Sequence, residues 1–184
     1  MDTKIYMCVY NFVQKHKALH KPIIFINDMS PKVMMVLFYG MMPILAIKLD
    51  PRIFAFAAMP LIELVLVTRF RNKIDRPRPF DVLDVTPLEN HSSGHSFPSL
   101  HCSSSFVITT SLFYINTTLG IIGLVVSIFV ALSRLFAGVH YPSDILAGIV
   151  IGLLFGTPYL FLQKLKRLFL SAFCFMPLIF CLSS

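Results

Sequence analysis

Residues 102–133 read CSSSFVITTSLFYINTTLGIIGLVVSIFVALS, without a single charged side chain. A helix that crosses the hydrocarbon core of a bilayer needs about 20 apolar residues, so this run is too long for one crossing. Its middle, NTTLG at 116–120, is rich in residues that favour turns. The run therefore predicts two antiparallel membrane-spanning helices joined at Asn116.

The rest of the chain has the same apolar character. Of its 184 residues, 56% are hydrophobic and 14% are charged, and the mean hydropathy is +0.75. Soluble domains carry about 25% charged residues, so the composition indicates an integral membrane protein. The fold class that we expect is all-α, a bundle of six membrane-spanning helices, at 31–48, 52–69, 99–115, 119–136, 143–163 and 168–183.

The N-terminal segment, residues 1–22, has a different pattern. Its apolar residues recur at helical spacing among lysines, which predicts an amphipathic helix lying at the membrane surface. It lacks the uninterrupted apolar stretch and the small-residue cleavage site of a signal peptide. With no internal repeat and no linker, residues 1–184 are interpreted as a single domain, comprising this helix, a transmembrane bundle at 31–183 and an active-site loop at 70–98.

Charge is concentrated in two loops of the predicted bundle. Residues 69–81 read RFRNKIDRPRPFD, and residues 133–144 read SRLFAGVHYPSD. Two predicted spans separate these loops, so both emerge on the same face of the membrane, and His101 at the start of the third span lies there too. Charge beside a membrane span is costly and usually functional, so this face is the candidate site.

The chemistry of this face suits a phosphate group. The sequence PSLH at 98–101 predicts the opening turn of a helix, whose free N–H groups and dipole favour an anion. His101, His140 and Asp144 supply a nucleophile or base, a group to orient it and an acid. Guanidinium groups match phosphate oxygens. Four arginines are predicted to converge on this face: Arg71, Arg76, Arg78 and Arg134. Taken alone, the second loop could instead be an interfacial loop whose histidine and aspartate cap a helix.

The spacing of these groups follows a known pattern of three parts: Lys, six residues, Arg-Pro; then Pro-Ser-Gly-His; then Ser-Arg, five residues, His, three residues, Asp. The third part is complete, from SR at 133–134 to Asp144. The second part has Leu100 in place of glycine, and the first has Arg71 in place of lysine. Over residues 71–144 the chain resembles the type-2 phosphatidic acid phosphatase superfamily of membrane lipid phosphatases.

The resemblance implies a role for each matching residue. His140 would be the nucleophile that forms a phosphohistidine, Asp144 would orient it, and His101 would protonate the leaving oxygen. The phosphate oxygens would be held by Arg71, Arg78, Ser99, Arg134 and the backbone N–H of Leu100. Lys73 is a second candidate for the lysine position. The resemblance implies no metal and no cofactor.

The activity implied by the resemblance is that of an integral membrane lipid phosphatase that dephosphorylates a lipid phosphate or diphosphate. Undecaprenyl diphosphate is the first choice of substrate, because small members of the superfamily often recycle that carrier. Two alternatives are a phosphatidylglycerophosphate or phosphatidic acid phosphatase, and a non-catalytic lipid-binding relative.

The charge pattern bears on partners and location. The net charge of +7 suits anionic lipid head groups or an anionic substrate. The basic residues form neither one block nor a series interleaved with aromatics, so no nucleic acid is expected; no obligatory protein partner is expected either.

The orientation in the membrane follows from basic residues at the other end of the predicted spans, because Lys48, Arg52 and Lys164 lie opposite the candidate site. The positive-inside rule then places the protein in the plasma or inner membrane with its site outside the cytoplasm, although the lysines of 1–22 oppose this unless that segment lies flat.

Five further polar residues are interpreted more simply. Arg76 and Lys73 are expected to be flanking solvated charges or interfacial anchors. His91 and His95, in a Ser- and Gly-rich loop without a carboxylate or cysteine nearby, are expected to add loop polarity or contact a head group rather than bind a metal. Glu63, alone within a span, is expected to pair with a basic side chain or to face the bundle interior.

Overall fold

The computed structural model describes residues 2–89 and 93–158, and within these ranges the chain is all-α and without strands, as the sequence predicts. The elements are α1 (Asp2–Lys15), the short 3₁₀ turn η1 (Lys17–Leu19), α2 (His20–Ile47), α3 (Arg52–Ile74), α4 (Pro79–Val82), α5 (Leu100–Ile115), α6 (Thr117–Phe136) and a last helix, Pro142–Pro158.

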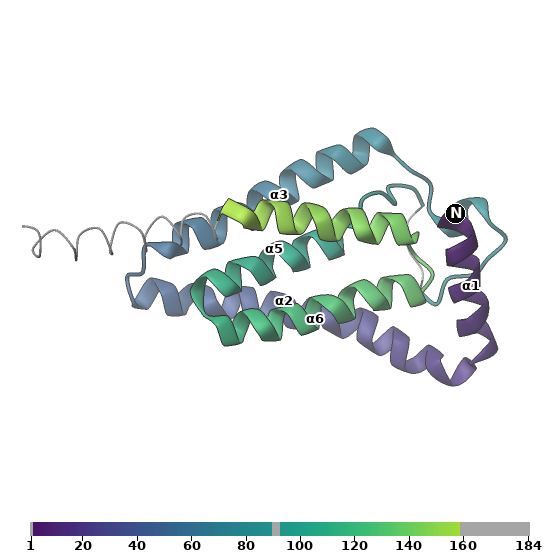
Figure 1. The fold of residues 1–184 in the computed structure, drawn as a ribbon, viewed down its shortest axis with the longest axis horizontal. Helices are drawn as coiled ribbons and strands as arrows, with labels where there is room; N and C mark the ends of the chain where they lie inside the picture. The colour runs from purple at the N-terminus through teal and green to yellow at the C-terminus, as the bar shows by residue number, and fades with distance from the viewer. Residues whose placement is uncertain (1, 90–92, 159–184) are drawn as a thin grey trace, which may run out of the picture.

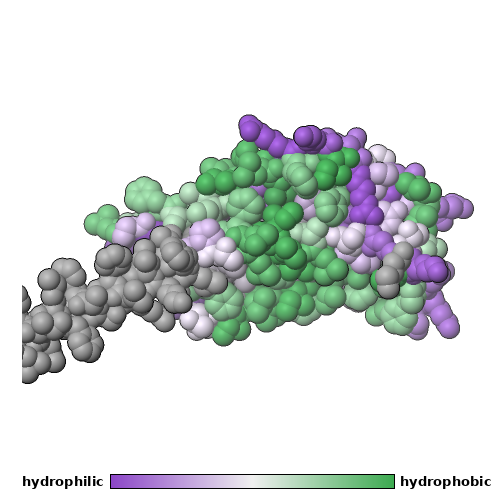
Figure 2. All heavy atoms as spheres, turned by 45° about the horizontal axis from the view of Figure 1, so that its top comes forward, coloured by the Kyte–Doolittle hydropathy of each residue, from purple (hydrophilic) through white to green (hydrophobic). Residues whose placement is uncertain are grey.

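The long helices form a bundle, and α1 lies across one of its ends (Figure 1). Helices α2, α3 and α6 are long and apolar enough to cross a membrane, while α5 and the Pro142–Pro158 helix are shorter apolar helices. On the face seen in Figure 2, hydrophobic side chains cover the middle of the bundle, and hydrophilic ones gather toward the end that carries α1. This arrangement is that of a membrane-spanning bundle. The predicted sixth span, 168–183, lies outside the described residues.

The turn predicted within the uncharged run is confirmed. Helix α5 ends at Ile115 and α6 begins at Thr117, and between them Asn116 is extended, with φ −154° and ψ 128°. Its side-chain oxygen caps α6 by accepting a hydrogen bond from the backbone N–H of Leu119 at 3.1 Å. The parity argument that places the two charged loops on one face therefore rests on a real turn.

Helix α5 packs against the Pro142–Pro158 helix through glycines. Gly148, Gly152 and Gly156 recur every four residues and so share one face of their helix. A Cβ atom at Gly148 would lie 2.6 Å from the backbone oxygen of Ser99, which leaves no room for a side chain. The two backbones approach closely for this reason, as is common for small residues between membrane helices.

Several helix boundaries differ from the sequence expectation. The N-terminal helix ends at Lys15 rather than at residue 22, and α2 begins at His20, well before the predicted span. Helix α3 continues to Ile74, beyond 69, into the predicted loop. Hydropathy marks the part of a helix that suits lipid, whereas its hydrogen bonds continue through flanking polar residues. Pro98 lies outside the first turn of α5, because the N-cap residue is Ser99.

A small apolar cluster fixes α1 near the loop that follows α6. Val13 of α1 packs with Ile23 of α2 and with Ala137 and Val139 of that loop, and all four side chains are buried. The hydroxyl of Tyr6 donates to the backbone oxygen of Gly138 at 3.0 Å. The N-terminal helix therefore covers the end of the bundle at which the candidate site residues lie.

Candidate active site

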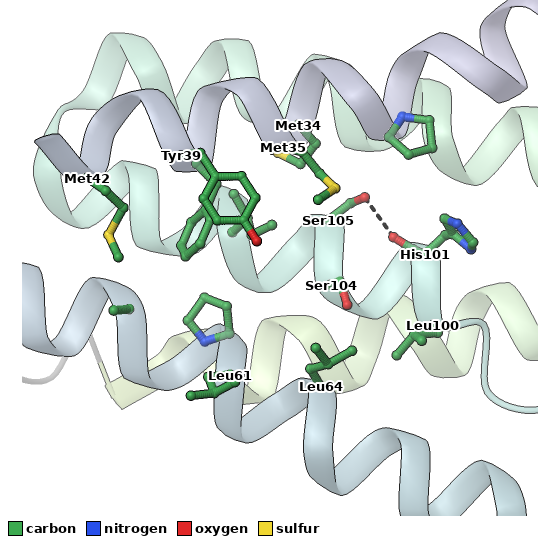
Figure 3. A pocket seen from close by; sticks show the side chains of 15 residues that line it. Met34, Met35, Tyr39, Met42, Leu61, Leu64, Leu100, His101, Ser104 and Ser105 are labelled. Carbon is green, nitrogen blue, oxygen red and sulfur yellow. Dashed lines mark hydrogen bonds between the residues drawn. The ribbon is translucent and has the colours of Figure 1, made fainter.

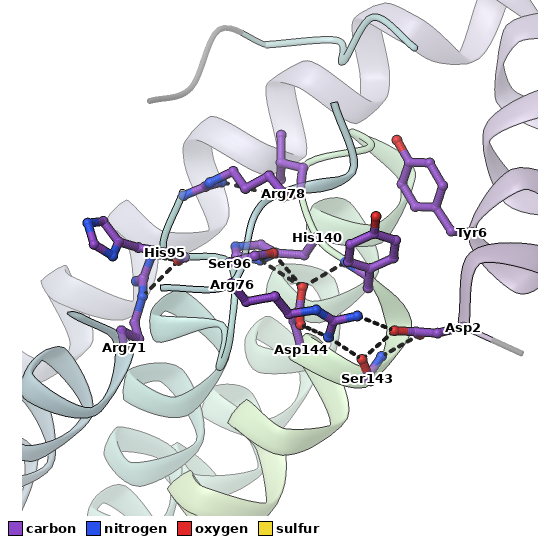
Figure 4. Close-up of polar contacts among 12 residues, drawn as sticks. Asp2, Tyr6, Arg71, Arg76, Arg78, His95, Ser96, His140, Ser143 and Asp144 are labelled. Carbon is purple, nitrogen blue, oxygen red and sulfur yellow. Dashed lines mark hydrogen bonds and ion pairs between the residues drawn. The ribbon is translucent and has the colours of Figure 1, made fainter. Parts of the chain in front are cut away.

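The core of the site is a buried histidine beside a buried carboxylate (Figure 4). His140 lies between α6 and the Pro142–Pro158 helix, and Asp144 lies in the first turn of that helix. The Nδ1 atom of His140 is 3.7 Å from Oδ2 of Asp144 and 3.4 Å from the hydroxyl of Ser96. Since Nδ1 faces the carboxylate, Nε2 is the ring nitrogen turned away from it.

Asp144 is held by neighbours that the sequence analysis missed. Its Oδ2 accepts hydrogen bonds from the Ser96 hydroxyl at 2.5 Å and from the backbone N–H of Tyr141 at 2.9 Å. Its Oδ1 accepts one from Nη1 of Arg76 at 2.5 Å. The expectation of a merely flanking charge at Arg76 is wrong, because this side chain forms ion pairs with Asp144 and Asp2. Only the tertiary structure brings these residues together.

Burial controls the protonation of His140. The residue is 2% exposed, and desolvation lowers its pKa to about 4. The positive charges of Arg78 and Arg134 act in the same direction, while Asp144 opposes them. The imidazole is therefore neutral at pH 7 in the unliganded site, which leaves a lone pair on the ring.

Arg78 is buried beside this pair. It is the N-cap residue of α4, where its backbone N–H donates to Asp81 at 2.7 Å. Its guanidinium donates to the backbone oxygens of Gly94 at 3.1 Å and Val139 at 3.4 Å. Burial, followed by the charges of Arg71 and Arg134, lowers the pKa of Arg78. Because like charges repel, three guanidinium groups close enough to act on one another are stabilised by a bound anion.

The other two arginines of this group come from the ends of membrane helices. Arg71, in the last turn of α3, donates through Nε to the backbone oxygen of His95 at 3.0 Å. Arg134, in the last turn of α6, is 4% exposed, and its Nη2 lies 3.5 Å from the backbone oxygen of Asn27, which accepts its hydrogen bond. Lys73 is exposed, so Arg71 is the one of the two candidates that turns to the site.

The first turn of α5 adjoins the histidine pair. The backbone N–H of Ser99 donates to the backbone oxygen of Asp144 at 2.9 Å, which joins the starts of two helices. Leu100 is the first residue of α5 and is absent from the residues with positive φ, so the motif's glycine is not required here for backbone freedom.

His101 lies one residue further along α5 and is exposed. It lines a groove between α2, α3 and α5 (Figure 3). The structure thus brings five site residues close enough for their charges to act on one another: Arg71, Arg78, Arg134, His140 and Asp144. The backbone N–H of Ser99 is hydrogen-bonded to the backbone oxygen of Asp144. His101 flanks this group on the side of the groove.

The remaining polar residues have local roles. His95 has φ 51°, its ring lies 3.0 Å from Asp75, and its backbone oxygen holds Arg71. His91 lies outside the described residues. Glu63 faces the bundle interior and accepts a hydrogen bond from the Ser104 hydroxyl at 3.1 Å. It does not pair with a basic side chain among the described residues.

Several known proteins are similar to this chain in sequence or in fold. A family model described as the PAP2 superfamily matches residues 51–168. Undecaprenyl-diphosphatase BcrC of Bacillus subtilis is 30% identical over 95 residues, which cover 52% of this chain and 49% of that protein. Lipid A 1-phosphatase of Rhizobium etli is 28% identical over 95 residues, which cover 48% and 40%. The match thus spans about half the length of these relatives or less.

Among solved structures, Aquifex aeolicus LpxE has the same fold. It aligns with a TM-score of 0.71 at 23% identity, over 86% of this chain and 94% of that one. The family match extends over most of the chain and includes the three motif groups that surround His140. On this ground the chain belongs to the PAP2 superfamily.

Proposed function

We propose that this protein is an integral membrane phosphatase that removes phosphate from a lipid phosphate or diphosphate through a phosphohistidine at His140. The observation that carries the proposal is a neutral, buried histidine oriented by a carboxylate and surrounded by guanidinium groups. An apolar groove reaches Leu100 and His101, in the first turn of the helix whose N-cap residue is bonded to Asp144. Together these features suit a substrate with a phosphate head and a hydrocarbon tail.

In the first step, Nε2 of His140 attacks phosphorus as the bond from phosphorus to the leaving oxygen breaks. Asp144 stabilises the imidazolium that forms, because its carboxylate faces Nδ1. His101 donates a proton to the leaving oxygen. Negative charge on the phosphoryl oxygens is held by Arg71, Arg78, Arg134, Ser99 and the N–H of Leu100.

In the second step, water attacks the phosphohistidine and the nitrogen–phosphorus bond breaks. His101, now neutral, accepts a proton from this water, and inorganic phosphate leaves. Guanidinium groups supply the positive charge in both steps, so the proposed path uses no metal ion.

The groove supports a lipid substrate. It has a volume of about 470 Å³ and lies between α2, α3 and α5 (Figure 3). Met35, Tyr39, Leu61 and Leu64 line it and are also exposed on the surface of the bundle, so the groove opens toward lipid. Leu100 and His101 also line it. We assign the groove to the part of the hydrocarbon chain nearest the phosphate.

Undecaprenyl diphosphate is our first choice of substrate, supported by the similarity to a relative of that activity. A lipid phosphate monoester, such as phosphatidylglycerophosphate or phosphatidic acid, is the alternative. Because one similar protein is named lipid A 1-phosphatase, phosphate monoesters are included among the substrates tested.

The test is phosphate release by the purified protein from undecaprenyl diphosphate, phosphatidylglycerophosphate and phosphatidic acid, with His140→Ala measured beside the wild type. We expect the diphosphate to be hydrolysed fastest and His140→Ala to lose at least about 1,000-fold in kcat. Equal rates in both proteins, or no release by the wild type from any substrate, would refute the proposal and favour a non-catalytic lipid-binding protein.

We also propose that the site faces the outside of the cytoplasm in the plasma or inner membrane. Lys48 and Arg52 lie at the opposite end of the bundle from His140, in agreement with the positive-inside rule. Asp84 is exposed in the loop on the side of the site. In intact cells, a cysteine at position 84 in a Cys8→Ser background should react with an impermeant thiol reagent. Labelling only after cell lysis would indicate the reverse orientation.

A further inference from the structure

A second polar cluster adjoins Asp144 and reaches α1 (Figure 4). Arg76 donates through Nη1 to Oδ1 of Asp144 at 2.5 Å and to the hydroxyl of Ser143 at 2.7 Å. Its Nη2 donates to Oδ2 of Asp2 at 2.8 Å. Asp2 also accepts from the backbone N–H of Ser143 at 3.1 Å and from its hydroxyl at 2.5 Å. Asp2, Arg76 and Ser143 stand outside the family motif positions.

The cluster fixes the rotation of the Asp144 carboxylate. Arg76 holds Oδ1, while Ser96 and the backbone N–H of Tyr141 hold Oδ2 on the side of His140. Rotation of the carboxylate would break a charge-assisted hydrogen bond, which is stronger than a neutral one. The orientation that Asp144 imposes on His140 therefore depends on Arg76.

Arg76 is itself fixed by α1 and by an aromatic ring. Its guanidinium carbon lies 4.4 Å from the centroid of the Tyr141 ring, within range of a cation–π contact. Burial by itself would raise the pKa of Asp2, but hydrogen bonds from Ser143 and the charge of Arg76 hold this pKa below its ordinary value. Asp2 is thus a carboxylate at neutral pH, and it joins the first turn of α1 to the site.

We propose that Arg76, fixed by Asp2 of α1, is a positioning residue for the pair of Asp144 and His140, so that the N-terminal helix helps to assemble the catalytic site. This inference rests on the proposed function, because it gives a role to the neighbours of the proposed nucleophile. It assigns no contact with the substrate to Asp2 or Arg76.

Loss of Arg76 has two expected consequences. The carboxylate of Asp144 loses its hydrogen bond at Oδ1 and is then held at Oδ2 alone, which loosens its orientation and lowers the fraction of molecules with His140 in position to attack. A positive charge is also removed from beside Asp144, so His140 holds its proton more tightly. The other charged groups that act on this pair, Arg71, Arg78 and Arg134, remain, and they are the ones assigned to bind phosphate.

The kinetic test compares Arg76→Gln, Arg76→Lys and Asp2→Asn in the full-length protein with the lipid substrate. We expect Arg76→Gln to lower kcat about 30-fold with KM within about threefold, since misplacement of a reacting group acts on the chemical step. Arg76→Lys should recover part of this loss, and Asp2→Asn should lose about fivefold. The double variant of Asp2→Asn with Arg76→Gln should be no worse than Arg76→Gln alone.

A second measurement does not need activity. The NMR titration of the His140 ring, assigned with His140→Asn, should move upward by about half a pH unit or more in Arg76→Gln. Lys32→Gln is the matched control, because Lys32 forms an exposed ion pair with Asp28 on α2. It should change neither kcat nor the titration.

The outcomes separate this inference from the proposed function. A wild type that hydrolyses no lipid phosphate refutes the function, while an upward shift of the His140 titration still supports the positioning role. An active wild type whose kcat and titration are unchanged in Arg76→Gln refutes the positioning role alone. If Arg76→Gln fails to fold, the double variant of Asp2→Asn with Arg76→Lys takes its place. A loss of kcat in this double variant equal to the product of the two single losses, with no change in the His140 titration, also refutes the positioning role.

Discussion

Helix α5 meets its neighbours in two different ways. Toward the Pro142–Pro158 helix the contact is closed, because Gly148 lets the two backbones touch at Ser99. Toward α2 and α3 the contact is open, and a groove of about 470 Å³ is lined by flexible or aromatic side chains such as Met35 and Tyr39. One helix therefore has a rigid side and an adaptable side.

The difference corresponds to the two parts of the proposed substrate. Phosphoryl transfer needs reacting groups in a fixed geometry, which dense packing and short hydrogen bonds provide. A hydrocarbon chain has no polar features to align, so a groove with pliable side chains accommodates it. The backbone hydrogen bond from Ser99 to Asp144 lies on the closed side, and His101 lies on the open side.

Among the variants that test this difference in packing, Gly148→Ala should give the largest effect, because it opens the closed side. The added Cβ would lie 2.6 Å from the Ser99 oxygen and would push the first turn of α5 away from Asp144. We expect a loss of about 100-fold or more in kcat/KM and a lower Tm. Gly40→Ala on α2 is the control, since no atom lies within 4 Å of the added Cβ there. Wild-type activity in Gly148→Ala would contradict the closed contact.

The burial of His140 on the closed side predicts the pH dependence of the wild type. Its pKa of about 4 keeps the ring neutral, and hence nucleophilic, at every pH above that value. Because kcat/KM reports the free enzyme, we expect kcat/KM, corrected for substrate ionisation, to stay constant down to about pH 5. Below the pKa of His140 it should fall about tenfold per pH unit. An acid limb near 6.5, the ordinary value for histidine, would mean that water reaches the ring.

Met35→Trp tests the open side by filling the groove. We expect KM to rise about tenfold for a long-chain lipid phosphate and to stay within about twofold for a short soluble phosphate ester, since only the former needs the groove. Val36→Trp is the matched control, because Val36 is exposed on the same helix and does not line the groove. Equal effects of both variants on both substrates would argue that the chain binds elsewhere.

Glu63→Gln should give the smallest effect. Glu63 accepts a hydrogen bond from Ser104 beside the groove and forms no ion pair among the described residues, and glutamine keeps its size and an acceptor oxygen. We expect Tm within about 2 °C and kcat within about twofold of the wild type. A loss of tenfold or more in kcat would show that the carboxyl takes part in the reaction.

Much of the fold could be predicted from the sequence. The uncharged run, the turn at Asn116 and the all-α class follow from local hydropathy and turn chemistry, and the structure confirms them. The ends of α2 and α3 could not be predicted in this way, since hydropathy reports which residues suit lipid and not where hydrogen bonding stops.

The candidate site likewise contains residues that the sequence points to and one whose role it does not reveal. Motif spacing pointed to His140, Asp144 and Arg134, and the structure places these three side chains close enough for their charges to act on one another. Arg76 was misjudged, because its partners, Asp2 and Asp144, are far from it in sequence. No local pattern distinguishes such a residue from a solvated charge.

From the sequence alone it follows that this chain forms membrane-spanning helices and that its two charged loops lie on one face, since hydrophobicity and parity are properties of the chain order. That α1 holds Arg76 against Asp144, and that α5 is closed on one side and open on the other, becomes visible only in the folded chain. The physical reason is that hydrogen bonds and side-chain packing act over a few ångströms between segments far apart in the chain, a proximity that exists only after folding.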